Sequence, residues 1–270
     1  MYKKIKNTAL FLKNKFSLKP KVGIVLGTGL GDMINIINIE QVIEYKDIPD
    51  FPVSTVESHH GKLIFGTVNN IQIVAMQGRF HYYEGYTPQQ ITFPIRVMKL
   101  LGIEYLFLSN ACGGLNPDYE IGDLMIINDH INLIPNPLIG PNIDELGPRF
   151  PDMSDSYNKN LINKALKIAH ENNIKVQQGC YVSVTGPTLE TPKEYRYYRI
   201  IGGDVVGMST TPEVIVARHM NIPCFAISIV TDLGVPGKIV KVTIEDVKKV
   251  AAQAEPKMTL LMQKLIFDLK

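Results

Sequence analysis

The first twenty residues carry an apolar stripe with the spacing of a helix. Its members recur at steps of three and four residues, at Tyr2, Ile5, Ala9, Leu12 and Phe16. This period places them on one face of an amphipathic helix within residues 1–20, with lysines around the other face. Because the stripe lacks the bulky anchors of a membrane-binding helix, we expect it to dock on the rest of the protein.

Beyond residue 20, short apolar runs alternate with segments of helical period. The apolar runs predict strands at 22–26, 63–68, 71–76, 103–108, 124–127, 176–184, 205–206 and 222–230. The helical segments lie at 88–101, 158–171, 192–201, 212–220 and 244–269. Helices between apolar strands are typical of an α/β fold with a mixed central sheet flanked by helices. The alternation continues on both sides of a proline-rich loop at 132–151, so we expect a single domain over residues 21–270.

Composition narrows the possible functions. The 28 basic and 26 acidic side chains leave a net charge of +2, which argues against general nucleic-acid binding. The three cysteines form no C-x-x-C pair, so neither a disulfide framework nor a zinc ribbon is expected, and a reducing, cytoplasmic location follows. No run approaches the roughly 18 apolar residues of a membrane span, so we expect no membrane partner.

A glycine-rich loop follows the first expected strand. Its glycines are Gly27, Gly29 and Gly31, and Asp32 stands where a dinucleotide-binding loop needs glycine or alanine. Closely spaced glycines still expose backbone N–H groups that can hold a phosphate, and the Thr28 hydroxyl adds a donor. Taken alone, the loop is explained equally well as a tight turn.

Arg79 and His81 come shortly after the expected strand at 71–76. Arginine is suited to two-pronged contact with an oxyanion, and a side chain two residues away in extended chain points to the same side. A lone histidine is more often structural, but here a nearby glycine loop also favours an anion. We therefore expect both side chains to face a bound anion.

Two more segments, 109–114 and 207–213, have the same polar character. Both are expected to begin where a strand ends, and α/β proteins place ligands at such ends. Ser209 or Thr210 can cap the next helix, whose N-terminus attracts anions, and capping alone is the alternative explanation. Together with the two earlier loops, these segments predict one site for inorganic phosphate or a phosphoryl group. A serine esterase is disfavoured, because residues 207–211 lack the last glycine of a hydrolase elbow.

Six motifs occur in order: GTGLG at 27–31, HHGK at 59–62, QGRFHYYEGY at 77–86, NACGGLNP at 110–117, GPTLET at 186–191 and GMSTTPEVIVAR at 207–218. The series resembles the trimeric purine nucleoside phosphorylases and the related methylthioadenosine phosphorylases. The resemblance implies a single α/β domain with a partly barrel-like mixed sheet, a homotrimer, and reversible phosphorolysis of a purine nucleoside to free base and ribose 1-phosphate. It implies phosphate as co-substrate and no metal or organic cofactor.

The resemblance also implies roles by motif position. The phosphate would be held by Thr28, His59, Arg79, His81, the backbone N–H of Ala111, and Ser209. The residues near the sugar would be Tyr83, Met208 and Ile244, and Phe150 would reach the site of a neighbouring subunit. The base pocket would be lined by Glu190, Val206, Gly207 and Asp232. The expected catalytic residues are His81, Glu190 and Asp232.

Three positions differ in the substrate specificity that the resemblance implies. Glu190 is typical of the 6-oxopurine branch, where it could accept from N1–H. Asp232 stands where that branch usually has asparagine, and an ionised carboxylate accepts from a 6-amino group, as in the methylthioadenosine branch. Ile244 falls where the family has a histidine near the ribose 5′-OH.

We expect Glu190 to outweigh Asp232, and the substrates to be 6-oxopurine ribo- or deoxyribonucleosides such as inosine and guanosine. Burial near Glu190 would raise the pKa of Asp232 and let it donate to the base. The alternatives are phosphorolysis of adenosine or methylthioadenosine, and a non-catalytic nucleoside-binding protein.

Overall fold

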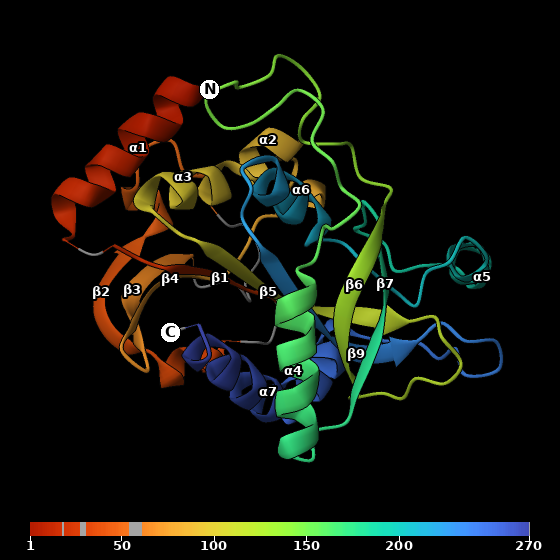
Figure 1. Cartoon of the computed structure of the whole chain (residues 1–270). Coiled ribbons are helices and arrows are strands. Elements are labelled where there is room, and N and C mark those ends of the chain that lie inside the picture. The colour runs from red at the N-terminus through yellow and green to blue at the C-terminus, as the bar shows by residue number, and fades with distance from the viewer. Residues whose placement is uncertain (18, 28–30, 54–60, 270) are drawn as a thin grey trace.

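A mixed β-sheet forms the centre of the computed structural model, which describes residues 1–17, 19–27, 31–53 and 61–269 (Figure 1). The strands are β1 (Val22–Leu26), β2 (Asn38–Glu44), β3 (Lys62–Val68), β4 (Ile71–Gln77), β5 (Tyr105–Gly114), β6 (Leu124–Asn132), β7 (Val176–Ser183), β8 (Val205–Gly207) and β9 (Cys224–Leu233). The helices are α1 (Tyr2–Lys15), α2 (Pro88–Ile91), α3 (Phe93–Leu101), α4 (Lys159–Glu171), α5 (Pro192–Ile200), α6 (Thr211–His219) and α7 (Ile244–Phe267).

The sheet is open on one side and closed on the other. Its strand order over the described residues is β2-β3-β4-β1-β5-β8-β7-β6-β9, and β5 pairs with β9 as well. That additional pairing closes β5, β8, β7, β6 and β9 into a small barrel, while β2, β3, β4 and β1 extend from it. Parallel pairs such as β1–β4 and antiparallel pairs such as β3–β4 both occur, so the predicted mixed, partly barrel-like α/β fold is confirmed.

Strand β5 is longer than predicted and corrects the expectation that residues 109–114 follow a strand. They lie inside β5, because β9 pairs with it from Leu106 opposite Cys224 to Gly114 opposite Leu233. The glycine permits this approach, since a Cβ at position 114 would lie 2.8 Å from Leu233 Cδ2. Strand β9 likewise runs past the predicted end, which places Asp232 within a strand.

Two further elements differ from the sequence prediction. The helix expected at 88–101 is broken at Thr92 into α2 and α3, where Pro94 lacks the N–H that a continuous helix would need. Strand β2 was not predicted, because its apolar residues Ile39, Val42 and Ile43 do not alternate regularly with polar ones; in the structure only Ile43 is buried.

The N-terminal helix α1 docks on the body, as its stripe predicts. Ile5, Ala9 and Leu12 are buried, and α1 lies along α3 (Figure 1). The Thr8 hydroxyl donates to the Pro49 carbonyl at 2.9 Å. Among the described helices, none is long and apolar enough to cross a membrane.

Candidate active site

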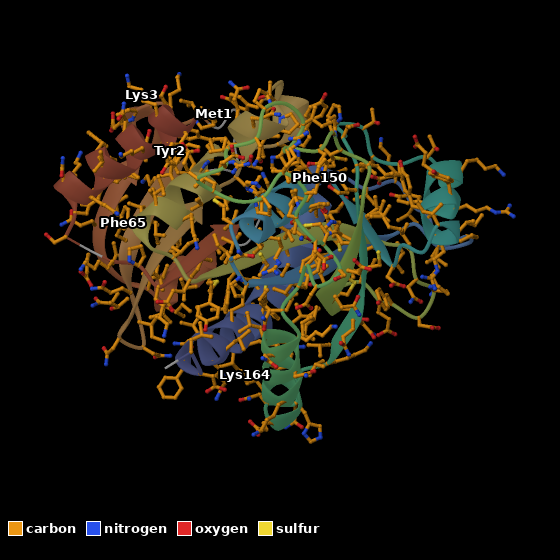
Figure 2. The ribbon with its side chains drawn as sticks, turned by 45° about the horizontal axis from the view of Figure 1, so that its top comes forward. Met1, Tyr2, Lys3, Phe65, Phe150 and Lys164 are labelled. Carbon is orange, nitrogen blue, oxygen red and sulfur yellow. The ribbon has the colours of Figure 1, made fainter. Side chains whose placement is uncertain are left out.

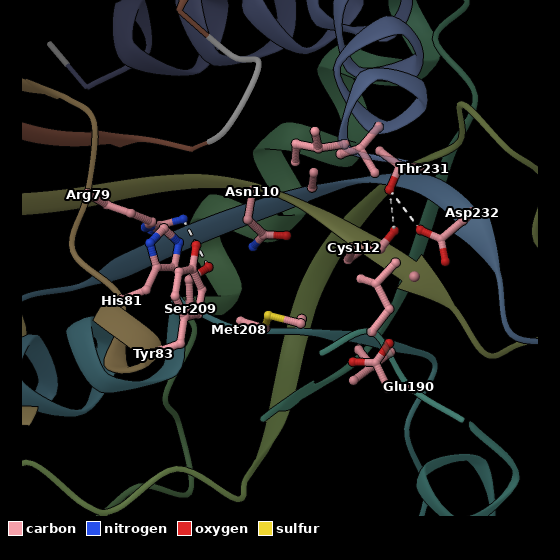
Figure 3. Close-up of a pocket in the computed structure, with 17 residues that line it drawn as sticks. Arg79, His81, Tyr83, Asn110, Cys112, Glu190, Met208, Ser209, Thr231 and Asp232 are labelled. Atoms are coloured by element: carbon pink, nitrogen blue, oxygen red, sulfur yellow. Dashed lines mark hydrogen bonds between the residues drawn. The ribbon is translucent and has the colours of Figure 1, made fainter. Parts of the chain in front are cut away.

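One pocket gathers residues from β5, β8, β9 and α7 and from the segments that follow β4, β7 and β8 (Figure 3). Arg79 follows β4, Ala111 lies in β5, Gly207 ends β8 and Asp232 lies near the end of β9. Because β5 pairs with both β8 and β9, segments distant in sequence meet here. The predicted site residues that line the pocket are Arg79, His81, Tyr83, Ala111, Glu190, Val206, Gly207, Met208, Ser209, Asp232 and Ile244.

Arg79 occupies one end of the pocket and is only 1% exposed. Its Nε donates to Glu213 Oε1 at 3.0 Å, and its Nη1 donates to the Ser109 carbonyl at 2.8 Å and to Ser209 Oγ at 3.1 Å. A buried carboxylate that accepts from Nε holds the planar guanidinium in one orientation. This end of the pocket therefore presents a fixed cation next to a hydroxyl.

His81 lies at the same end and is almost fully buried. Glu84 Oε1 accepts from the His81 backbone N–H at 2.7 Å and lies 3.2 Å from ring Nδ1, while the ring stacks on Tyr83 with centroids 4.7 Å apart. Burial lowers the pKa of His81 below its usual value, although the contact with Glu84 raises it. The imidazole is therefore neutral at pH 7, with Nδ1–H directed at Glu84 and Nε2 as an acceptor.

At the start of α6, the side-chain cap that was the alternative explanation for Ser209 and Thr210 is absent. Thr210 is the N-cap residue, but its side chain does not cap the helix. Its Oγ1 instead accepts from Asn110 Nδ2 at 2.9 Å and lies 3.2 Å from Ser209 Oγ. The φ of Thr210 is 68°, a rare value for a β-branched residue, and such backbone strain concentrates at functional sites. Capping therefore does not explain these residues: the Ser209 hydroxyl accepts from Arg79 in the pocket lining, and the Thr210 hydroxyl accepts from Asn110.

Two carboxyl groups, Glu190 and Asp232, lie at the other end of the pocket (Figure 3). Asp232 accepts from the Thr231 hydroxyl at 3.0 Å and from the Tyr195 hydroxyl at 3.4 Å. Burial raises the pKa of both carboxyls, and the charge of Asp232 raises that of Glu190 further. The predicted rise in the pKa of Asp232 is confirmed in direction, with burial as its cause.

Met208 lies between the two ends, where close packing requires glycine (Figure 3). A Cβ at Gly207 would collide with the Tyr181 hydroxyl, and one at Gly186 would collide with Met208 Sδ. These contacts explain why glycines flank this wall of the pocket. This wall of the pocket is therefore closely packed, with the Met208 side chain between the two polar ends.

Two of the predicted residues, Phe150 and Ile244, are exposed. Phe150 is 88% exposed, is absent from the pocket lining and stands at the surface of the proline-rich loop (Figure 2). Ile244, at the start of α7, is 52% exposed and contributes to the lining. Thr28 and His59 lie outside the described residues.

Several residues that shape the pocket were missed by the sequence analysis. Glu213 and Glu84 hold Arg79 and His81, and Tyr195 contacts Asp232. A signal existed only for Glu84, three residues after His81, because i and i+3 positions meet in a single helical turn. Among the described residues, no group of three His, Cys, Asp or Glu side chains is arranged to hold a metal ion.

The sequence and the fold match known proteins over most of their length. The model of the phosphorylase superfamily matches residues 21–266. Purine nucleoside phosphorylase 1 of Geobacillus stearothermophilus is 53% identical over 230 residues, which cover 85% of this chain and 84% of the relative.

Crystal structures of the Schistosoma mansoni purine nucleoside phosphorylase resemble the whole fold. The complex with adenosine has a TM-score of 0.94 at 42% identity and covers 98% of this chain and 97% of that one. The complex with inosine has a TM-score of 0.93 at 41% identity, covering 98% and 95%. The chain belongs to the purine nucleoside phosphorylases, pentosyltransferase enzymes of the phosphorylase superfamily.

Proposed function

We propose that this chain catalyses the reversible phosphorolysis of 6-oxopurine nucleosides, with inosine and guanosine as substrates and inorganic phosphate as co-substrate. The observation that carries the proposal is the division of the pocket into a cationic end at Arg79 and an acidic end at Glu190 and Asp232. An anionic phosphate needs positively charged donors, which the Arg79 end supplies. A purine needs hydrogen-bonding groups along its edge, which the carboxyl groups of Glu190 and Asp232 supply.

The cationic end fits the phosphate. Arg79, Ser209 and the backbone N–H of Ala111 offer donors to a phosphate that attacks the anomeric carbon, and we assign Thr28 and His59 to the same task by motif position. Neutral His81 offers Nε2 as an acceptor, which suits a protonated phosphate oxygen. Fixed donors of this kind position the nucleophile without reorganisation during the reaction.

The acidic end fits the departing base. As the bond from the anomeric carbon to the purine breaks, its electron pair moves onto the base, which a proton donor at N7 or O6 stabilises. The raised pKa of Asp232 favours its protonated form, and a protonated carboxyl donates where the family asparagine would. Glu190 then accepts from N1–H, while Tyr83, Met208 and Ile244 contact the sugar and Val206 and Gly207 flank the base.

A 6-aminopurine preference is the second candidate, because Asp232 itself favours it. An ionised Asp232 would accept from a 6-amino group and repel O6, and the Schistosoma mansoni relative has been crystallised with both adenosine and inosine. The two candidates therefore differ in the protonation state of one carboxyl.

The test compares phosphate-dependent base release from inosine, guanosine, adenosine and methylthioadenosine, with a phosphate-free control. We expect faster release from inosine and guanosine, and no release without phosphate. Asp232→Asn should raise the ratio of inosine to adenosine turnover by about tenfold or more, because hydrogen bonds to the base edge discriminate strongly. Preference for adenine nucleosides would favour the second candidate, and release without phosphate would exclude phosphorolysis.

We also propose that the enzyme is a cytoplasmic homotrimer in which Phe150 reaches the sugar site of a neighbouring subunit. The exposure of this large apolar ring supports the proposal, because an aromatic side chain at the surface of a proline-rich loop gains by burial against a second copy. The reaction as proposed assigns no step to a metal or organic cofactor, since side chains and backbone groups supply the donors.

A further inference from the structure

A second pocket lies between the N-terminus of α1, the α2–α3 segment and the proline-rich loop. It shares no lining residue with the candidate active site. In Figure 1 the N-terminus lies next to the loop that joins β6 to α4. The residues that line this pocket are Met1, Tyr2, Gln89, Arg96, Pro137, Leu138, Ile139, Pro141, Asn142, Ile143 and Glu145.

Arg96 is the central group of this pocket, because the residue is only 6% exposed and has no acidic partner among the described residues. No Asp or Glu among the described residues forms an ion pair with it. Among the described residues, the guanidinium makes one hydrogen-bond contact, a long one of 3.5 Å between Nη1 and His219 Nδ1. Burial alone lowers the pKa of Arg96, to about 10, with no nearby charge acting against the shift.

His219 does not supply the missing negative charge. Asn142 directs its Nδ2 to Asp144 Oδ1 and to the Gly147 carbonyl, so its Oδ1 faces His219 Nε2 at 3.2 Å and accepts from it. With the proton on Nε2, Nδ1 of a neutral ring accepts from Arg96. Burial lowers the pKa of His219, and the charge of Arg96 lowers it further. The arginine therefore faces a neutral partner.

A nearly buried cation without a counter-ion is costly, and an anion entering the pocket would remove that cost. The remaining walls select among anions. Most of the lining is apolar, contributed by Pro137, Leu138, Ile139 and Ile143, and the one acidic lining residue is Glu145 at the exposed side. Arg96 is the one nearly buried cation among the lining residues, so a singly charged carboxylate matches its charge and an aliphatic body matches the apolar walls.

We propose that this pocket binds a small aliphatic carboxylate, with the carboxylate on Arg96 and the hydrocarbon against the proline-rich loop. The site is independent of the proposed phosphorolysis and stands or falls separately from it. Binding there would fix the loop against α1 and α3, because the ligand contacts all three segments.

The test is calorimetric titration of the full chain with hexanoate, with hexan-1-ol as a neutral probe of the same length and inorganic phosphate as a dianion. Hexanoate should bind at least tenfold more tightly than hexan-1-ol. Arg96→Gln should weaken hexanoate binding at least tenfold, and Lys99→Gln, which removes a cation from the same helix outside the pocket, should not. Arg79→Gln should leave it unchanged, which separates this pocket from the candidate active site.

A second variant covers the case in which Arg96→Gln fails to fold. Ile139 is 66% exposed, so Ile139→Asp should fold, and its carboxylate at the pocket should reduce hexanoate binding, while Ile139→Asn should not. Hexanoate binding that survives both Arg96→Gln and Ile139→Asp would overturn the proposal. So would Arg96-dependent binding of phosphate in place of hexanoate, or a change in oligomeric state as the only effect of the substitutions.

Discussion

Arg79 and Glu213 are 134 positions apart in sequence, and Nε of the arginine donates to Oε1 of the glutamate at 3.0 Å. Both side chains are almost completely buried. The carboxylate therefore acts on the pocket through the arginine and is a positioning residue, because it orients the guanidinium without lining the pocket itself.

Replacing Glu213 with glutamine tests this positioning role. The amide keeps the size of the side chain but removes the charge that holds Nε, so the guanidinium becomes less fixed. We expect the KM for phosphate to rise about tenfold or more, with a smaller change in the KM for the nucleoside. Steady-state kinetics with each substrate varied in turn measures this split. Glu171→Gln, at an exposed position of α4, is the control, and an equal loss for both substrates would indicate collapse of the site instead.

Asp232 makes the stability of the protein depend on pH in a predictable direction. Because its pKa is raised in the folded state, the native protein binds more protons than the unfolded chain, and stability falls as pH rises from the usual aspartate value through the folded value. Asp232→Asn removes this loss. We expect the variant to gain Tm over the parent at pH 8, and the gain to shrink toward pH 4.

The pKa of Asp123 is shifted in the opposite direction, so the dependence of Tm on pH should differ in sign from that of Asp232. Burial raises its pKa, but hydrogen bonds from Gln177 and Lys175 and from the Glu120 backbone outweigh it, so the net shift is downward. A carboxyl of this kind contributes stability above its usual pKa, which is lost as pH falls through the folded value. Asp123→Asn should therefore lower Tm at pH 8. Equal behaviour of the two variants would contradict the assigned directions.

Docking of α1 predicts a contrast between two leucines two residues apart. Leu12 is 1% exposed and Leu10 is 47% exposed. Leu12→Ala should reduce the free energy of unfolding by roughly 2–5 kcal/mol, because it removes buried methyl groups and leaves a cavity. Leu10→Ala should change it by less than about 0.5 kcal/mol. Urea unfolding measures both, and similar small effects would show that α1 contributes little to stability.

Phe150 tests the proposed assembly. Since the ring is 88% exposed within one chain, Phe150→Ala should leave the stability of the isolated chain unchanged. If it completes a neighbouring pocket, the KM for the nucleoside should rise several-fold, while Ile200→Ala, a 71% exposed control on α5, should have no effect. Light scattering of both variants reports the oligomeric state. An unaltered nucleoside KM would refute the role given to Phe150.

The sequence by itself determined the features that depend on local pattern. The three- and four-residue steps from Ile5 to Leu12 set the buried face of α1, because a helix repeats every 3.6 residues. The apolar runs marked most of the strands, since both faces of a covered sheet are buried. Arg79 and His81 could be named together because they stand two residues apart beyond a strand.

Only the tertiary structure decided the features that depend on distant partners. Closing β9 onto β5 set the place of Asp232 at one end of the pocket, and burial there raised its pKa, which no local pattern encodes. The partner of Arg79 lies in α6. Arg96 was unremarkable within a helical pattern, and only packing against the proline-rich loop made it a buried cation. Charge and burial depend on what surrounds a group in space, and sequence neighbours supply only part of that surrounding.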